Sequence, residues 1–202
     1  MAWREEVAAI KRCMYRDFDY WGKPVPGFGD AEARIMILGL APGAHGSNRT
    51  GRMFTGDGSG NFLFPALYRA GLCNQTTSIA RGDGLELKDI FITAVGRCAP
   101  PKNKPTREEL NHCQPFLLRE LHLLKNLQGI VALGRIAFDE VRRIYSLPRL
   151  DFAHGAFYHF EDAEIPWLLA SYHPSRQNTQ TGRLTIEMFD AIWERAKAEI
   201  GR

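Results

Sequence analysis

The sequence lacks several features that would assign a protein to a class directly. None of its apolar runs approaches the roughly 20 residues that cross a bilayer, so we expect no membrane partner. The start, MAWREEVAAIKRC, is charged and amphipathic, unlike a signal peptide. We find no internal repeat, no low-complexity tract and no C-x-x-C pair. The 202 residues therefore predict one cytoplasmic domain, residues 1–202, that buries its own core as a monomer.

The sequence also has no large excess of charge of one sign. Lysine and arginine together number 26 against 23 acidic residues, which gives a formal net charge of +3. This balance permits a polyanionic partner but does not require one. Several basic residues fall in predicted loops or helix starts, where they can reach phosphate or simply face solvent: Arg49, Arg52, Lys102, Lys104, Arg107, Arg176 and Arg183.

What the sequence does contain is a regular alternation of strands and helices. Short, almost continuous apolar runs predict strands that are covered on both faces, at Arg34–Leu40, Ile90–Val95, Gly129–Leu133 and Trp167–Tyr172. Helical patterns lie among them, at Asn61–Ala70, Arg107–Lys125, Arg135–Ile144 and Leu184–Ile200. Thr106 and Glu109 form a capping box at the start of the second helix. The alternation predicts an α/β fold, a three-layer α/β/α sandwich with a central, mainly parallel four-stranded sheet.

Two long loops follow predicted strands. The first, Gly39–Gly60, reads GLAPGAHGSNRTGRMFTGDGSG and fits neither the P-loop nor the dinucleotide-binding glycine pattern. The second, Ser171–Thr185, reads SYHPSRQNTQTGRLT. Ligands of open parallel sheets bind beyond the carboxyl ends of the strands, so both loops are expected to meet at the binding edge.

Taken as whole strings, both loops resemble motifs of the type-b (family 5) uracil-DNA glycosylases. A third segment, ITAVGRCAPPKNKPT at Ile92–Thr106, is similar to the central segment of that family. With AWREEV, YWGKPVPGFGD and VALGRIAFD, the resemblance covers essentially the whole chain. It implies an enzyme of base excision repair that hydrolyses the N-glycosidic bond of uracil in DNA and leaves an abasic site.

The resemblance also implies roles for single residues. Asp57 would orient the attacking water or stabilise the cationic sugar, and His173 would hydrogen-bond the departing base. Phe54 would stack on the extruded base, the backbone around Gly43 and Ala44 would contact base or water, and Asn103 would supply a polar contact. Each has a plainer interpretation: Asp57 as a local turn residue, His173 as a surface histidine, and Phe54 as an ordinary core residue.

Ala94 bears on which bases are excised. Sister families carry an asparagine at the corresponding site, which reads the edge of uracil. A small apolar residue leaves no donor–acceptor pair unsatisfied by a different base. The resemblance and this substitution together predict activity on other deaminated bases, such as hypoxanthine and xanthine.

The partner implied is DNA that contains deaminated bases. The second loop would press Arg176, Gln177 and Asn178 into the duplex where the base leaves. Ser175, Thr179 and the basic loop residues, Arg52 and Arg183 among them, would contact phosphates.

The family also carries a [4Fe–4S] cluster on four cysteines. Cys98 and Cys113 match the later pair of ligands, whereas the N-terminal C-x-x-C pair is absent and Cys13 and Cys73 match no ligand position. We expect that the natural protein extends further at its N-terminus and that its cluster is structural.

Two other classes stay open from the residues alone. A nucleotide- or nucleic-acid-binding α/β module without catalysis would use the same glycine-rich edge. A phosphohydrolase of similar architecture would require a cluster of metal-binding carboxylates, for which the loops offer only Asp57.

Overall fold

The centre of the protein is a sheet of buried strands. The structure, a computed structural model, describes residues 2–201. Strands β2 (Ile35–Gly39), β3 (Ile90–Ala94), β4 (Gly129–Leu133) and β6 (Trp167–Ser171) run parallel to one another and are almost entirely buried. They match the four predicted strands to within one residue or two at each end. Their apolar side chains, alternating between the two faces, explain why the runs are nearly continuous.

The sheet has six strands, so the prediction of four was wrong in number. The order is β1-β3-β2-β4-β6-β5, and the two edge strands, β1 (Phe28–Gly29) and β5 (Phe157–Tyr158), are antiparallel to their neighbours. Each is only two residues long. No apolar run or alternation can signal a strand of that length, because a period of two needs several residues to be seen.

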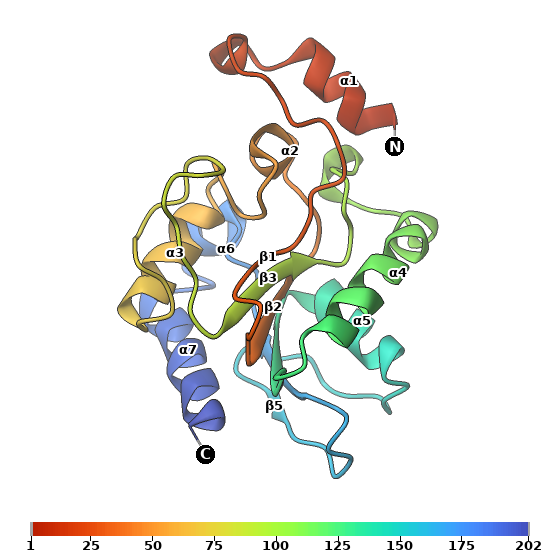
Figure 1. Ribbon diagram of the computed structural model, residues 1–202, viewed down its shortest axis with the longest axis vertical. Coiled ribbons are helices and arrows are strands. Elements are labelled where there is room, and N and C mark those ends of the chain that lie inside the picture. The colour runs from red at the N-terminus through yellow and green to blue at the C-terminus, as the bar shows by residue number, and fades with distance from the viewer. Residues whose placement is uncertain (1, 202) are drawn as a thin grey trace.

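Helices cover both faces of the sheet, as Figure 1 shows, which confirms the α/β sandwich. Helices α3 (Gly60–Arg69) and α7 (Ile186–Ile200) pack on one face, where Phe64 and Trp193 are fully buried. Helices α4 (Arg107–Leu123) and α5 (Arg135–Ile144) cover the other face through residues such as Phe138. The capping box of Thr106 and Glu109 is present at the start of α4.

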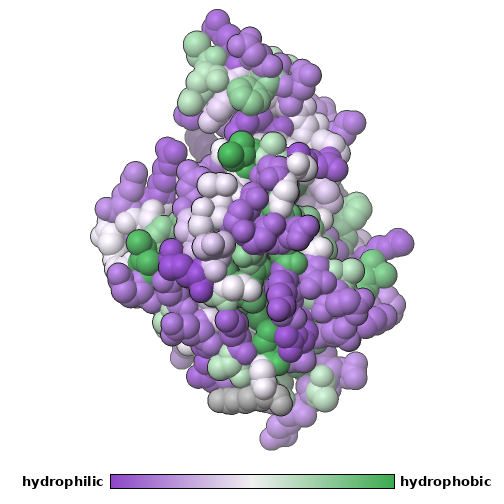
Figure 2. All heavy atoms as spheres, turned by 60° about the vertical axis from the view of Figure 1, so that its left-hand side comes forward, coloured by the Kyte–Doolittle hydropathy of each residue, from purple (hydrophilic) through white to green (hydrophobic). Residues whose placement is uncertain are grey.

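The chain before β1 lies above the carboxyl ends of the strands. It comprises α1 (Ala2–Ile10), the short 3-10 helix η1 (Cys13–Tyr15) and an irregular segment that descends into the sheet (Figure 1). The segment is tied to α2 (Ser47–Thr50) by backbone hydrogen bonds from Trp21 to Arg49 (2.9 Å) and from Gly22 to Asn48 (3.1 Å). In the space-filling view this N-terminal part protrudes at the top of a largely hydrophilic face (Figure 2).

The two long loops contain structure of their own. Helix α2 lies within the first loop, α6 (Arg176–Gln180) lies within the second, and η2 (Pro101–Asn103) follows β3. All three therefore gather at the carboxyl edge of the sheet, where ligands of such folds bind. Within residues 2–201, no helix combines the length and apolar character of a membrane span.

Candidate active site

A cleft of about 730 Å³ opens at the carboxyl edge of the sheet. Its walls come from the first loop, from the end of β3 with η2, from the second loop, and from the N-terminal segment. The cleft brings together ten of the residues predicted for the site: Gly43, Ala44, Phe54, Asp57, Ala94, Asn103, His173, Ser175, Arg176 and Gln177. Residues separated by more than 130 positions in the chain thus line one space.

Asp57 is held rigidly by the first turn of α3. Its Oδ1 accepts hydrogen bonds from the backbone N–H groups of Ser59 and Gly60, each at 3.0 Å. Oδ2 faces Gly43 and Gly46; a Cβ on Gly43 would lie 3.3 Å from it, and a Cβ on Gly46 would collide with it. The two glycines therefore allow the side chain of Asp57 to pack closely against the backbone of the first loop.

The charge of Asp57 is disfavoured by its surroundings. Burial raises the pKa of its carboxyl, and the two backbone donors together with the charges of Arg176 and Arg49 oppose that rise. A carboxylate of this kind is a poorly solvated acceptor that can orient a water molecule or respond to positive charge nearby.

His173 follows β6 and lines the same cleft. Burial lowers its pKa to about 4, so the imidazole is neutral at physiological pH. Its backbone is fixed by hydrogen bonds to its carbonyl from Ser175 N–H and from the Asn178 side chain, both at 2.8 Å. A neutral imidazole with one N–H can donate to a developing anion without being a cation itself.

Phe54 stacks on this imidazole, with ring centroids 6.0 Å apart and an angle of 28° between the planes. Its backbone has φ of 53°, a conformation that non-glycine residues rarely adopt. The ring lies against the end of β2, where a Cβ on Gly39 would come within 2.8 Å of it. Such strain at a binding surface is typical of a residue placed for function.

Ala94 is the last residue of β3 and is 1% exposed, beside Gly39 in the sheet register. Together they give the cleft a small, apolar floor. Asn103 is exposed at the rim in η2, and both it and Lys102 have positive φ. The asparagine is thus near the cleft but is not buried in it.

Arg52 was predicted to contact DNA, and the structure places it elsewhere. It is 8% exposed, and its guanidinium pairs with Asp83 (2.7 Å) while donating to Ser78 (2.7 Å) and Thr55 (3.0 Å). A guanidinium enclosed in this way is not available to a phosphate. Its contacts instead hold the turn at Thr55, directly between Phe54 and Asp57, against the segment around Ser78.

Of the residues predicted in the second loop, some line the cleft and others do not. Ser175 accepts a hydrogen bond from Asn178 N–H and caps α6, while Arg176 and Gln177 line the cleft. Asn178 is not among the cleft-lining residues; its side chain supports His173. Arg183 lies outside the cleft, with its guanidinium 4.7 Å from the ring centroid of Tyr172.

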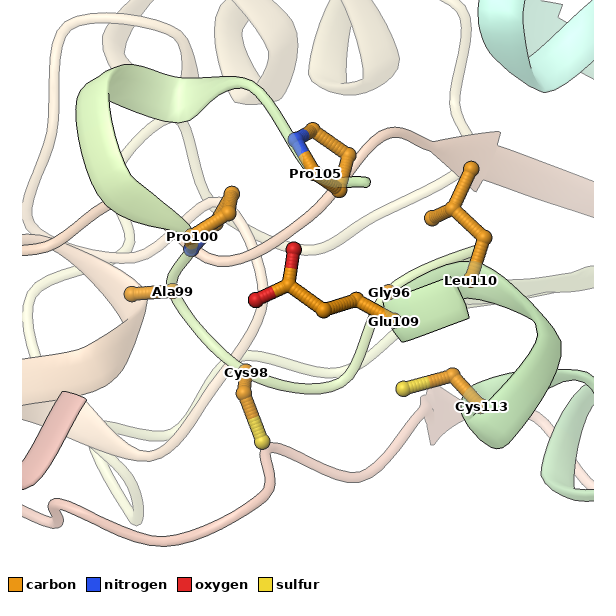
Figure 3. Close-up of a pocket in the computed structure, with 8 residues that line it drawn as sticks. All are labelled: Gly96, Cys98, Ala99, Pro100, Pro105, Glu109, Leu110 and Cys113. Atoms are coloured by element: carbon orange, nitrogen blue, oxygen red, sulfur yellow. The ribbon is translucent and has the colours of Figure 1, made fainter. Parts of the chain in front are cut away.

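The two predicted metal ligands come together at a smaller pocket. Cys98, after β3, and Cys113, on α4, border the same side of it (Figure 3). Cys98 Sγ accepts a hydrogen bond from Arg4 (2.8 Å), and Cys113 Sγ accepts one from the backbone N–H of Arg97 (3.3 Å). Cys13 is exposed, and Cys73 is buried in the core beneath α3.

These two thiols do not complete a four-cysteine cluster. In the part of the chain that the structure describes, no three or more histidine, cysteine or acidic side chains are grouped as metal ligands would be. Residues 2–201 therefore fit half of the expected cluster site at most.

Some residues of the cleft wall were not singled out from the sequence, and three of them can contribute polar or aromatic contacts. Arg12, Tyr15 and His45 line it beside the predicted residues. His45 stands inside the first motif and was open to prediction. Arg12 and Tyr15 precede the first strand in an irregular segment, and no periodicity indicates where such a segment folds back.

The comparisons with known proteins agree with this geometry. A family model described as the uracil DNA glycosylase superfamily matches residues 26–197, so the chain belongs to that superfamily. It is 54% identical to a type-5 uracil-DNA glycosylase of Thermus thermophilus, over the whole of this chain and 91% of the relative. Identity is 49% to a type-5 enzyme of Mycobacterium bovis and 44% to one of Pyrobaculum aerophilum, which this chain covers to 76% and 86%. The predicted relationship to the type-5 enzymes is confirmed.

Proposed function

We propose that this protein hydrolyses the N-glycosidic bond of uracil in DNA and leaves an abasic site. The observation that carries the proposal is the pairing of Asp57 and His173 across one cleft in a member of the uracil-DNA glycosylase superfamily. The names of its type-5 relatives support the same reaction.

The chemistry assigns one task to each side chain. As the bond breaks, positive charge develops on the sugar and negative charge on the base. Asp57, with Oδ1 occupied by backbone donors, offers Oδ2 to a water molecule in the cleft and stabilises the sugar cation. His173 donates a hydrogen bond to the base, and Phe54 stacks on its face.

The test uses a duplex with a single uracil, followed by alkali, which breaks the strand at an abasic site. The wild type is expected to cleave, and Asp57→Asn and His173→Gln are expected to lose about 100-fold or more of the rate. Asp151→Asn and His112→Gln, both at exposed positions, are the matched controls and should retain it. A wild type that binds the duplex without forming abasic sites would instead identify the non-catalytic binding module.

We further propose that the enzyme excises other deaminated bases, such as hypoxanthine and xanthine. Support comes from Ala94, which places a methyl group and no hydrogen-bonding side chain at the floor of the cleft. A site without fixed edge donors rejects a different base only weakly. Oligonucleotides that carry each base in turn test this, and strict activity on uracil would refute it.

DNA is proposed to lie over the cleft with its backbone along the second loop. Arg176 and Gln177 project there from α6, at positions that allow contact with the strand that releases its base. Arg176→Ala should weaken binding to damaged and undamaged duplex alike, because phosphate contacts carry no sequence information.

A third proposal concerns the cysteines. Cys98 and Cys113 are proposed as two ligands of a structural [4Fe–4S] cluster whose other two thiolates come from cysteines outside residues 2–201. The pocket that the two cysteines share supports this proposal, and a cluster of this type takes four thiolates. Protein produced without air from the full gene should contain about four irons per chain, and Cys113→Ser should lose them; iron-free wild type would refute the proposal.

A further inference from the structure

The N-terminal arm, which we define as residues 11–20, forms a wall of the cleft that the motifs do not cover. Arg12 and Tyr15 line the cleft together with Asp57 and His173. In Figure 1 this arm lies above α2 at the top of the molecule, on the side of the sheet edge that carries the site. Part of the arm therefore faces whatever occupies the cleft.

The arm is fixed to the first motif by aromatic and cationic side chains. The Arg49 guanidinium lies 4.3 Å from the ring centroid of Tyr15 and 4.9 Å from that of Phe18. The Tyr20 hydroxyl is hydrogen-bonded to His45 Nδ1 (2.9 Å). Cation–π contacts and a partly buried hydrogen bond of this kind hold a segment in one position.

Charge distinguishes Arg12 from its neighbours. Arg49 is engaged with two rings and with the carbonyls of His45 and Gly56. Burial, followed by the charges of Arg12 and Arg49, lowers the pKa of His45, so this imidazole adds no charge to the wall. Arg12 is exposed and forms no ion pair with an acidic side chain of residues 2–201. It is the cation that this wall presents to the cleft.

Arg176 borders the same cleft from the second loop. Two arginines, one from the arm and one from α6, thus line the same cleft as Asp57 and His173, together with Lys102 of η2. Phosphates lie on both sides of an extruded nucleotide, and arginine binds them through charge-assisted hydrogen bonds.

We propose that the N-terminal arm is a DNA-contacting wall, in which Arg12 binds a backbone phosphate of the strand that carries the target base, beside Tyr15. This rests on the proposed glycosylase function. The arm thereby extends the DNA surface beyond the family motifs, and Arg12 acts on binding rather than on bond cleavage.

The test compares Arg12→Ala with Arg16→Ala, which removes the same charge from an exposed position of the arm outside the lining of the cleft. Affinity for a uracil duplex and for the same duplex without uracil is measured from about 50 mM to 200 mM salt. Loss of one phosphate contact should reduce the slope of log K against log salt by about 0.9, so the binding deficit of Arg12→Ala shrinks roughly 3.5-fold over this range. Arg12→Glu should show a larger deficit at low salt.

The single-turnover rate at saturating enzyme separates this proposal from the function. Arg12→Ala should excise uracil at the wild-type rate once bound, with an unchanged melting temperature. A wild-type salt slope in Arg12→Ala, or an equal change in Arg16→Ala, would overturn the role of Arg12 while excision by the wild type continues. If the wild type itself excises no uracil, the glycosylase function fails instead.

Discussion

Replacing His173 with glutamine should make the protein more resistant to acid while it slows base excision. The pKa of His173 falls from 6.5 to about 4 in the folded protein because the ring is buried. Between these values the unfolded chain binds a proton that the folded protein does not. Stability is therefore fully present above pH 6.5 and is lost as the pH falls toward 4. At about 1.4 kcal/mol per pKa unit, the wild type should lose up to about 3 kcal/mol by pH 4 through this group alone.

Urea denaturation of wild type and His173→Gln at a series of pH values from about 8 to 4 measures this difference. The free energy of unfolding of the wild type should decline more steeply, so the gap between the two proteins changes by up to about 3 kcal/mol. The exposed His112→Gln variant should follow the wild type. Parallel curves for wild type and His173→Gln would show that the imidazole is not held neutral by burial.

Three more substitutions test the surroundings of this residue. Asp57→Asn should raise the melting temperature, since asparagine keeps the oxygen that accepts from Ser59 and Gly60 and removes a poorly solvated charge. Excision should fall about 100- to 10,000-fold. A lower melting temperature would contradict this reasoning. Gly46→Ala should reduce excision and lower the melting temperature, because its Cβ would lie 2.6 Å from Asp57 Cβ, an atom fixed to the backbone, and the first loop must shift. Wild-type kinetics and stability would show that the loop yields at no cost. Arg52→Met should destabilise the fold by about 1–3 kcal/mol, because it removes the cation from a partly buried ion pair whose carboxylate keeps its backbone donors, and the salt dependence of DNA binding should stay unchanged. A stable Arg52→Met with a reduced salt slope would restore Arg52 as a phosphate contact.

The layers of the fold could be predicted because strands buried on both faces are continuous apolar runs in the sequence. Runs such as Gly129–Leu133 are apolar at every position, and the amphipathic segment Arg135–Ile144 has the helical bounds predicted for it. The edge strands β1 and β5 show no such run. Each consists of two residues whose pairing depends on a neighbouring strand, and tertiary contacts of that kind cannot be inferred from periodicity.

The positions of site residues in loops that directly follow strands could be predicted from the sequence. Whether a given side chain faces solvent or is enclosed by other residues could not. Asp57 and His173 meet because parallel strands end at one edge. In the sequence, Arg52 and Arg176 both stand in loops from which an arginine could reach DNA. In the structure Arg52 instead forms an ion pair with Asp83, 31 residues later, and is enclosed. The approach of residues 78–83 to the first motif depends on the irregular segment between α3 and β3, in which no pattern specifies the path.

The cleft shifts the protonation equilibria of His173 and Asp57 away from those in water, in each case against the charged form. Burial keeps His173 uncharged and raises the pKa of Asp57, and the same exclusion of water strengthens any hydrogen bond that either makes to a developing charge. The backbone N–H groups of Gly60 and Ser59 offset this penalty first, and the charges of Arg176 and Arg49 lower the pKa of Asp57 further. Arg49 is also the residue on which the N-terminal arm stacks. Arg49 therefore contributes both to the ionisation of the carboxylate and to the placement of the arm, so a substitution of Arg49 is expected to affect both.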